Sequence, residues 1–158
     1  MGYTNYLRLN IPTKGIRELE ESYQLAIKQM NKLIRSYQVE VKSIDDKHHA
    51  RLSGYSAYTT TKSYGGIKIN GTQDYSHEDF ILREHLKEND SFSFCKTAQK
   101  PYDVVVKACM LILKHYLPDQ VQVSCDGDAD DFKGSIDLIR RYIGINVAKN
   151  AAFNLLKE

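Results

Sequence analysis

The chain has 158 residues, of which 42% are hydrophobic and 27% are charged, as in ordinary globular proteins. Its 22 Lys and Arg residues nearly balance its 20 Asp and Glu residues, so no strong overall field would attract nucleic acid or an anionic membrane. The longest apolar run, Val104–Leu113, is about half the length that spans a bilayer. These features predict a single domain over residues 1–158 and argue against membrane and nucleic-acid partners.

Cysteine content and the N-terminal sequence bear on the cellular compartment. The three cysteines are too few and too scattered for a disulfide framework. Residues 1–15 lack the apolar segment and the small-residue cleavage site of a secretory signal. We therefore expect a reduced, cytoplasmic protein.

The first part of the chain predicts a strand, a long helix and a second strand. Apolar and polar residues alternate over residues 3–11, which is typical of a strand that Pro12 ends. Between residues 16 and 37 apolar residues recur every three or four positions, which predicts a helix with one buried stripe. Alternation over residues 39–43 predicts a second, short strand.

The next segment is rich in Gly, Ser, Thr and Tyr and predicts a hairpin with strands Tyr55–Thr60 and Tyr64–Asn70. A Tyr side chain combines a flat apolar ring with a polar hydroxyl, so it suits both half-exposed sheet faces and binding surfaces. One interpretation is that these residues only cover a sheet face. The other is a protein-binding surface formed by Tyr55, Tyr58, Tyr64 and Tyr75.

Further elements follow in the second half of the chain. Ser76 and Asp79 form a capping-box pattern that predicts a helix over residues 77–87, with a strand over residues 80–83 as the alternative. A helix that begins at Pro101 is apolar on nearly every side, so we expect it to be the buried core helix. The other predicted elements are strands over residues 92–95 and 121–125 and helices over residues 131–143 and 147–155.

These elements predict one α/β or α+β domain. We expect a mixed sheet of about five or six strands packed against three main helices, over residues 16–37, 101–116 and 131–143. If the strands before and after the core helix are parallel neighbours, their carboxyl ends meet at one edge of the sheet, where open α/β sheets bind ligands. Lys96 and Thr97 would then form a pocket for phosphate or a nucleotide.

An acidic turn follows the strand over residues 121–125. Asp126, Asp128 and Asp130 stand at alternate positions, a spacing at which carboxylate oxygens can wrap Mg²⁺ or Ca²⁺. The position that requires Gly in a calcium loop is Asp131, so the pattern departs from that loop. The alternative interpretation is a turn that caps the following helix.

Two segments around the core helix, FSFCKTAQKPYDVVVKA and VSCDGD, resemble uncharacterised small proteins of bacteria and their phages. The shared features are Phe-Cys-Lys-Thr, a Pro-Tyr-Asp that opens a helix, and an Asp-Gly after the next strand. The resemblance implies a phage or mobile-element origin, and it implies no activity and no catalytic residues.

No phosphate loop, dinucleotide fingerprint, serine-hydrolase motif or zinc-ligand spacing occurs in the sequence. We therefore expect a non-enzymatic intracellular binding protein that recognises a protein partner, for example a phage-encoded inhibitor of a host system, with self-association as a further option. Two alternatives stay open. One is a Mg-dependent phosphoryl-transfer or nuclease-like enzyme that uses the acidic turn. The other is a nucleotide-binding protein that uses the pocket at the strand ends without chemistry.

Overall fold

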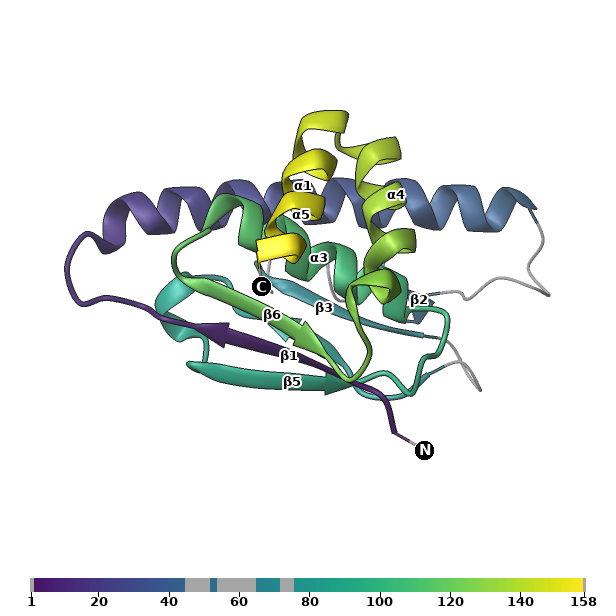
Figure 1. The fold of residues 1–158 in the computed structure, drawn as a ribbon, viewed down its shortest axis with the longest axis horizontal. Coiled ribbons are helices and arrows are strands. Elements are labelled where there is room, and N and C mark those ends of the chain that lie inside the picture. Colours follow the sequence, from purple (N-terminus) through teal and green to yellow (C-terminus); the bar gives the residue numbers. More distant parts are fainter. Residues whose placement is uncertain (1, 45–51, 54–64, 72–75, 158) are drawn as a thin grey trace.

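The structure is a computed structural model and describes residues 2–44, 52–53, 65–71 and 76–157 (Figure 1). Its elements, in chain order, are β1 (Thr4–Leu9), α1 (Ile16–Ile44), β2 (Leu52–Ser53), β3 (Ile67–Gly71), β4 (Phe80–Leu82), the 3₁₀ helix η2 (Leu86–Glu88), β5 (Phe92–Lys96), α3 (Asp103–Tyr116), β6 (Val121–Cys125), the 3₁₀ helix η3 (Ala129–Phe132), α4 (Lys133–Tyr142) and α5 (Ile145–Lys157). This mixture of helices and strands confirms the α+β class.

The strands form two small sheets in place of one mixed sheet. The first sheet has the order β5-β1-β6, and the second has the order β2-β3-β4. β1 is antiparallel to both of its neighbours, with Tyr6 opposite Phe94 on one side and opposite Ser124 on the other. β5 and β6 therefore run in the same direction, but β1 lies between them, so they are not the direct neighbours that the sequence suggested.

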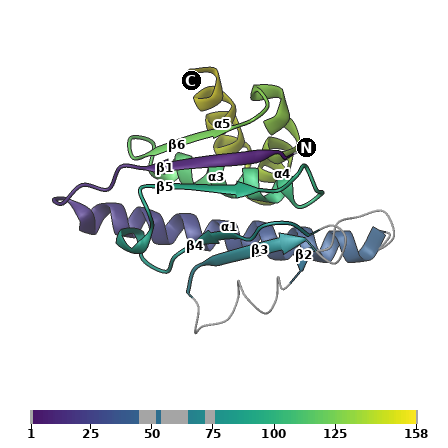
Figure 2. The same cartoon turned by 90° about the horizontal axis from the view of Figure 1, so that it is seen from below.

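α3 is the centre of the core, as its apolar sequence predicts. It packs against α1, α4, α5 and β6, and all of its residues from Val105 to Leu113 are buried. Figure 2 shows β6, β1 and β5 in front of α3. The main contacts of α4 are with α1, α3 and α5, so the predicted packing of three helices against one sheet is not confirmed.

α1 is longer than predicted and takes the place of the predicted second strand. Residues 39–43 continue the helix to Ile44. Neither Gly nor Pro occurs between Tyr37 and Ile44, and apolar residues recur at Tyr37, Val41 and Ile44, which is helical spacing. The short alternation of Val with polar residues fits both periods, and a helix that has already formed extends readily because only its nucleation is unfavourable.

The segment after β3 contains β4 and η2 in place of the predicted helix over residues 77–87. Phe80 and Leu82 are buried while Ile81 faces solvent, which is the period of a strand. β4 also pairs with β3, with Phe80 opposite Ile69. The alternative strand over residues 80–83 is therefore the confirmed prediction, because pairing with the preceding strand outweighs a local capping pattern.

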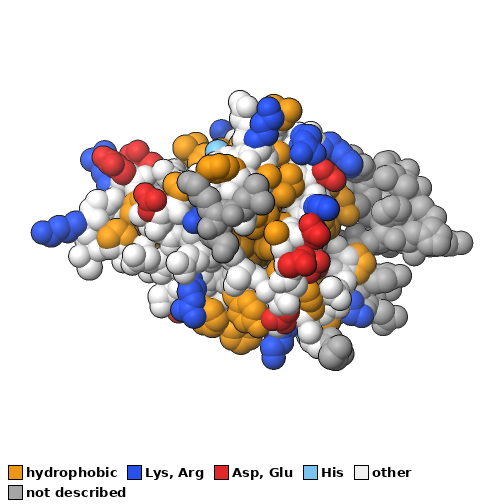
Figure 3. All heavy atoms as spheres, in the orientation of Figure 1, with side chains coloured by type: hydrophobic (Ala, Val, Ile, Leu, Met, Phe, Trp, Pro, Cys, Tyr) orange, Lys and Arg blue, Asp and Glu red, His pale blue; other side chains and the backbone are white. Residues whose placement is uncertain are grey.

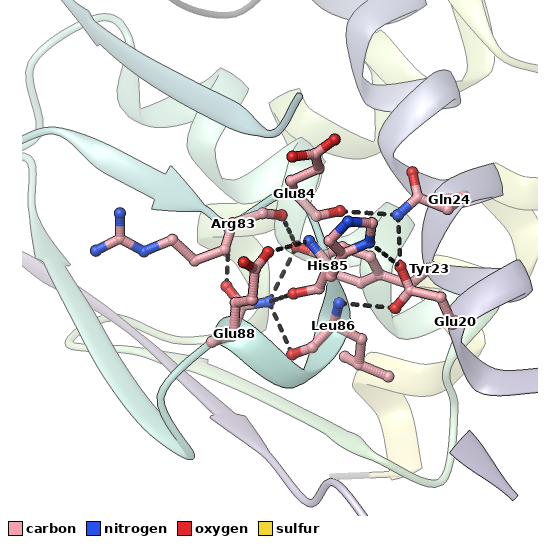
Figure 4. A network of polar contacts seen from close by, with 9 residues as sticks. Glu20, Tyr23, Gln24, Arg83, Glu84, His85, Leu86 and Glu88 are labelled. Carbon is pink, nitrogen blue, oxygen red and sulfur yellow. Dashed lines mark hydrogen bonds and ion pairs between the residues drawn. The ribbon is translucent and has the colours of Figure 1, made fainter. Parts of the chain in front are cut away.

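A polar network fastens the turn between β4 and β5 to α1 (Figure 4). The hydroxyl of Tyr23 donates to the carbonyl oxygen of Arg83 at 2.5 Å. The carboxylate of Glu20 accepts from the backbone N–H of Leu86 at 2.8 Å and lies 3.0 Å from Nδ1 of His85. Figure 4 shows the side chains of α1 directed into the turn, so this network holds the turn against the helix.

The pairing of His85 with Glu20 makes this network sensitive to pH. The hydrogen bond to Glu20 raises the pKa of His85 above its usual 6.5, against a smaller opposing effect of burial. Burial acts to raise the pKa of Glu20, but hydrogen bonds from Gln24, the backbone of Leu86 and His85 together hold it below its usual 4.5. The His85 contribution to stability is thus complete below about pH 6.5 and is lost as the pH rises through the raised pKa. The Glu20 contribution is present above about pH 4.5 and is lost at lower pH.

We expect the unfolding midpoint of the wild-type protein to exceed that of His85→Gln by more at about pH 6 than at about pH 9, because the imidazolium that pairs with Glu20 is lost at high pH. Thermal denaturation followed by circular dichroism measures the difference. In a Glu20→Gln background, His85→Gln should have little pH-dependent effect. A difference between wild type and His85→Gln that does not change with pH would contradict the pairing.

Candidate functional site

The segments that flank α3 meet at the edge of the first sheet that is formed by the ends of its strands. β5 and β6 both end at this edge, and β1 begins between them. The N–H of Thr97 donates to the carbonyl of Tyr3, and the N–H of Asp126 donates to the carbonyl of Thr4, each at 3.0 Å. The two sets of strand-end residues predicted from the sequence therefore share an edge, with β1 separating them.

A buried network centred on Asp103, the first residue of α3, lies under this edge. Oδ1 of Asp103 accepts from Oγ1 of Thr97 at 2.5 Å and from Nδ2 of Asn5 at 2.7 Å. Its Oδ2 accepts from Nζ of Lys107 at 2.5 Å. Lys107 is fully buried, and its ammonium also lies 4.3 Å from the centroid of the Tyr3 ring. We call Asn5, Thr97, Asp103 and Lys107 the Asp103 hub, because these charge-assisted bonds join β1, the end of β5 and α3.

Lys96 and Thr97, predicted to act together on a phosphate, face opposite sides of the sheet. Thr97 is fully buried, and its hydroxyl donates to Asp103 in the hub. Lys96 is exposed, and its ammonium lies 5.8 Å from the centroid of the Phe94 ring. Thr97 thus stabilises the fold, while the side chain of Lys96 is exposed to solvent.

The acidic turn after β6 uses its carboxylates within the protein. Asp126 accepts from the hydroxyl of Tyr6 at 2.7 Å and from the N–H of Thr4 at 2.9 Å. Asp128 caps η3 by accepting from the N–H of Asp130 at 3.0 Å. Among the described residues, no three His, Cys, Asp or Glu side chains are grouped as metal ligands. The geometry matches the capping interpretation, and the predicted metal site gains no support from it.

Two groups near this edge, the thiol of Cys95 and the hydroxyl of Tyr3, have a raised pKa, and burial is the largest cause in each case. Burial raises the pKa of the Cys95 thiol to about 12, and the thiol donates to the carbonyl of Glu78 at 3.5 Å. Burial is the main cause that raises the pKa of the Tyr3 hydroxyl, and the side chains of Cys125 and Asp131 raise it further. Since a nucleophilic Cys requires a lowered pKa, Cys95 behaves as a small core residue.

The turn from β5 into α3 holds two non-glycine residues in left-handed conformations. φ is +53° at Ala98 and +54° at Gln99, and the N–H of Lys100 donates to the carbonyl of Thr97 across the turn at 2.9 Å. This conformation costs an L-residue about 1–2 kcal/mol. The contacts on either side of the turn, including those of the Asp103 hub, must therefore hold it in place.

The outer face of the first sheet, on the side away from α3, exposes rings and cations. We call Tyr6, Arg8, Phe92, Phe94 and Lys96 the aromatic face. The strand register places Tyr6 opposite Phe94 and Arg8 opposite Phe92, and Phe92 and Phe94 are 40% and 53% exposed. The guanidinium carbon of Arg8 lies 4.6 Å from the centroid of the Phe92 ring. Figure 3 shows hydrophobic side chains gathered over β5 with Lys and Arg side chains beside them.

The rest of this outer surface is small and polar. On β6, Ser124 lies opposite Tyr6 and Gln122 lies opposite Arg8, and both are exposed. Asp126 lies at the edge of the face, where its hydrogen bond raises the pKa of the Tyr6 hydroxyl. The outer face is thus an open platform of rings with cations at its side.

Sequence reasoning found the strand that carries Phe92 and Phe94 but did not identify its exposed face. Alternation shows that a strand has two faces and does not show which face is buried. In the structure Cys95 is 3% exposed, while the two Phe rings face solvent. The available signal was size, because the face of β5 that lies toward α3 carries the small residues Ser93 and Cys95.

The tyrosines predicted to form a protein-binding surface, Tyr55, Tyr58, Tyr64 and Tyr75, lie outside the described residues. The predicted strand Tyr55–Thr60 also lies outside them. β3 (Ile67–Gly71) overlaps the partner strand predicted over Tyr64–Asn70 and ends one residue later. The binding role of these tyrosines stays a prediction.

No family model matches this chain, and neither the curated proteins nor the solved structures yield a match. In the part of the chain that the structure describes, no helix is long and apolar enough to cross a membrane.

Replacing Asp103 by Asn should lower the free energy of unfolding by about 3–5 kcal/mol, because Lys107 would stay buried without an opposite charge. Urea denaturation measures this change. Asp137 forms an exposed ion pair with Arg140, so the control substitution Asp137→Asn should change stability by about 0.5 kcal/mol or less. A comparably small effect of Asp103→Asn would contradict the role assigned to the hub.

Gln99→Gly should raise the free energy of unfolding by up to about 1 kcal/mol, because relief of the left-handed strain exceeds the entropy that Gly adds to the unfolded chain. The same urea experiment measures it. Gln122→Gly is the control, since Gln122 lies in β6, where Gly should be destabilising. Destabilisation of equal size at both positions would show that the turn is unstrained.

Proposed function

We propose that this chain is a binding protein that catalyses no reaction and recognises a macromolecule through the aromatic face. The observation that carries the proposal is the exposure of Phe92 and Phe94, at 40% and 53%, on one face of a strand whose other face packs inward. Exposure of large apolar rings to water is unfavourable. Clustered exposed rings with polar surroundings are typical of interaction sites.

The order of the platform supports a binding role. The hydroxyl of Tyr6 is held by Asp126 at 2.7 Å, and the Asp103 hub joins β1 to α3 beneath the rings. A surface that is already ordered loses little conformational entropy when a partner binds. The aromatic face is therefore suited to a flat or extended partner.

A catalytic role has less support in the described residues. Thr97 and Lys107 are fully buried and hydrogen-bond within the hub, and burial raises the pKa of Cys95 to about 12. Groups that perform chemistry must reach a substrate in a reactive protonation state. The proposal keeps the binding class expected from the sequence and assigns the surface to the first sheet.

Photo-cross-linking tests this proposal without assuming the class of the partner. Benzoyl-phenylalanine in place of Phe94 should form an adduct in cells that express the protein, because this position lies within the aromatic face. Phe153 on α5, which is also 53% exposed, is the matched control position and should form none. Irradiation followed by denaturing electrophoresis detects the adduct. No adduct at Phe94, or equal adducts at both positions, would refute the proposal.

A further inference from the structure

We infer that the partner of the aromatic face is single-stranded nucleic acid. This inference rests on the proposed function and names the ligand class of the same surface. Single strands present unpaired bases with flat faces and a phosphate backbone with regular negative charge.

The three rings of the face provide separate positions for bases. Phe94 lies opposite Tyr6 on the neighbouring strand, and Phe92 stands two residues before it on β5. The centroid of the Phe92 ring lies 6.3 Å from that of the Tyr6 ring and 6.2 Å from that of the Phe94 ring. Phe92 and Phe94 are 40% and 53% exposed. Because every base has a π face, successive bases of an extended strand can stack on such rings whatever the sequence.

A cation accompanies each exposed Phe ring. The guanidinium carbon of Arg8 lies 4.6 Å from the Phe92 centroid, and the ammonium of Lys96 lies 5.8 Å from the Phe94 centroid. Both side chains are exposed and can contact phosphate beside a stacked base. Among the described residues, the acids beside the face include Asp126, whose carboxylate already accepts two hydrogen bonds, and Glu78, whose carboxylate accepts from the backbone N–H of Lys96 at 2.9 Å. Arg8 and Lys96, standing beside three rings, complement a polyanion.

This inference departs from our sequence expectation, which argued against nucleic acid from a net charge of +2. Net charge is a sum over the whole chain, whereas contact with a single strand depends on a few cations beside stacking rings. Folding brings Arg8 from β1 and Lys96 from β5 onto one face. That juxtaposition is a property of the strand pairing and is invisible in the composition.

Other occupants fit the face less well. A stable dimer buries about 800 Å² per partner, whereas the large hydrophobic side chains exposed on this face are Phe92 and Phe94. A twofold contact between copies would also bring Arg8 and Lys96 of one copy close to those of the other. A nucleic-acid duplex stacks its bases on one another and shows only their edges in its grooves, so rings on an open sheet would find no base face.

Fluorescence anisotropy of the full chain with a labelled oligouridylate of about ten nucleotides tests the inference. Contacts of Arg8 and Lys96 with two phosphates should give a slope of about −1.4 for log affinity against log salt, and Arg8→Gln should reduce it to about −0.7. Phe94→Leu keeps an apolar side chain but removes the ring, so it should weaken binding about tenfold or more. Phe153→Leu should bind like the wild type, and thermal melts should show both variants folded.

Equal affinity of Phe94→Leu and wild type, equal competition by a duplex or by uridine monophosphate, or no binding at about 50 mM salt would each overturn the inference. The photo-cross-linking experiment at Phe94 distinguishes a failure of the nucleic-acid inference from a failure of the proposed function. A nuclease-sensitive adduct supports both. A protein adduct overturns the nucleic-acid inference and leaves the proposed function standing, and the absence of any adduct overturns both.

Discussion

The hydrogen bonds and the ion pair accepted by the carboxylate of Asp103 are the interactions that anchor the first sheet to α3. A fully buried ammonium requires an opposite charge, and Asp103 supplies it to Lys107 while accepting from Asn5 and Thr97. The bonds that result join β1, the end of β5 and the start of α3, and they help to hold the strained turn between β5 and α3. All of these donors point inward. The outer side of the same strands faces away from this network, and that is where the rings and the cations Arg8 and Lys96 lie.

Much of the fold could be predicted because its core helix has an unambiguous pattern. The stretch that became α3 is apolar on nearly every side, so its burial and the two flanking strands could be inferred without knowledge of the rest of the chain. The strand predicted over residues 39–43 and the helix predicted over residues 77–87 were wrong, because a neighbouring element overrides each short local pattern. The alternative strand over residues 80–83 is confirmed by the pairing of β4 with β3. The division into two sheets could not be predicted, since strand order depends on pairings between residues distant in sequence.

The candidate site could be predicted only in part, for a related reason. The meeting of the strand ends was expected, yet the sequence could not show that Thr97 turns inward to Asp103 while Lys96 turns outward to Phe94. The sequence allowed the acidic turn to be interpreted as a helix cap, and the structure assigns the cap to Asp128, whose side chain accepts from the N–H of Asp130. The aromatic face was missed because exposure is decided by which side of β5 packs on α3, and alternation alone leaves both sides equivalent.

Amide chemical shifts of a ¹⁵N-labelled chain titrated with single-stranded oligouridylate test most directly whether the outer face of the first sheet is the binding surface. The account predicts saturable shifts confined to β1 and β5, largest near Tyr6 and Phe94, with α5 unperturbed. Shifts centred instead on α1, whose surface carries Lys28, Lys32 and Arg35, would contradict it.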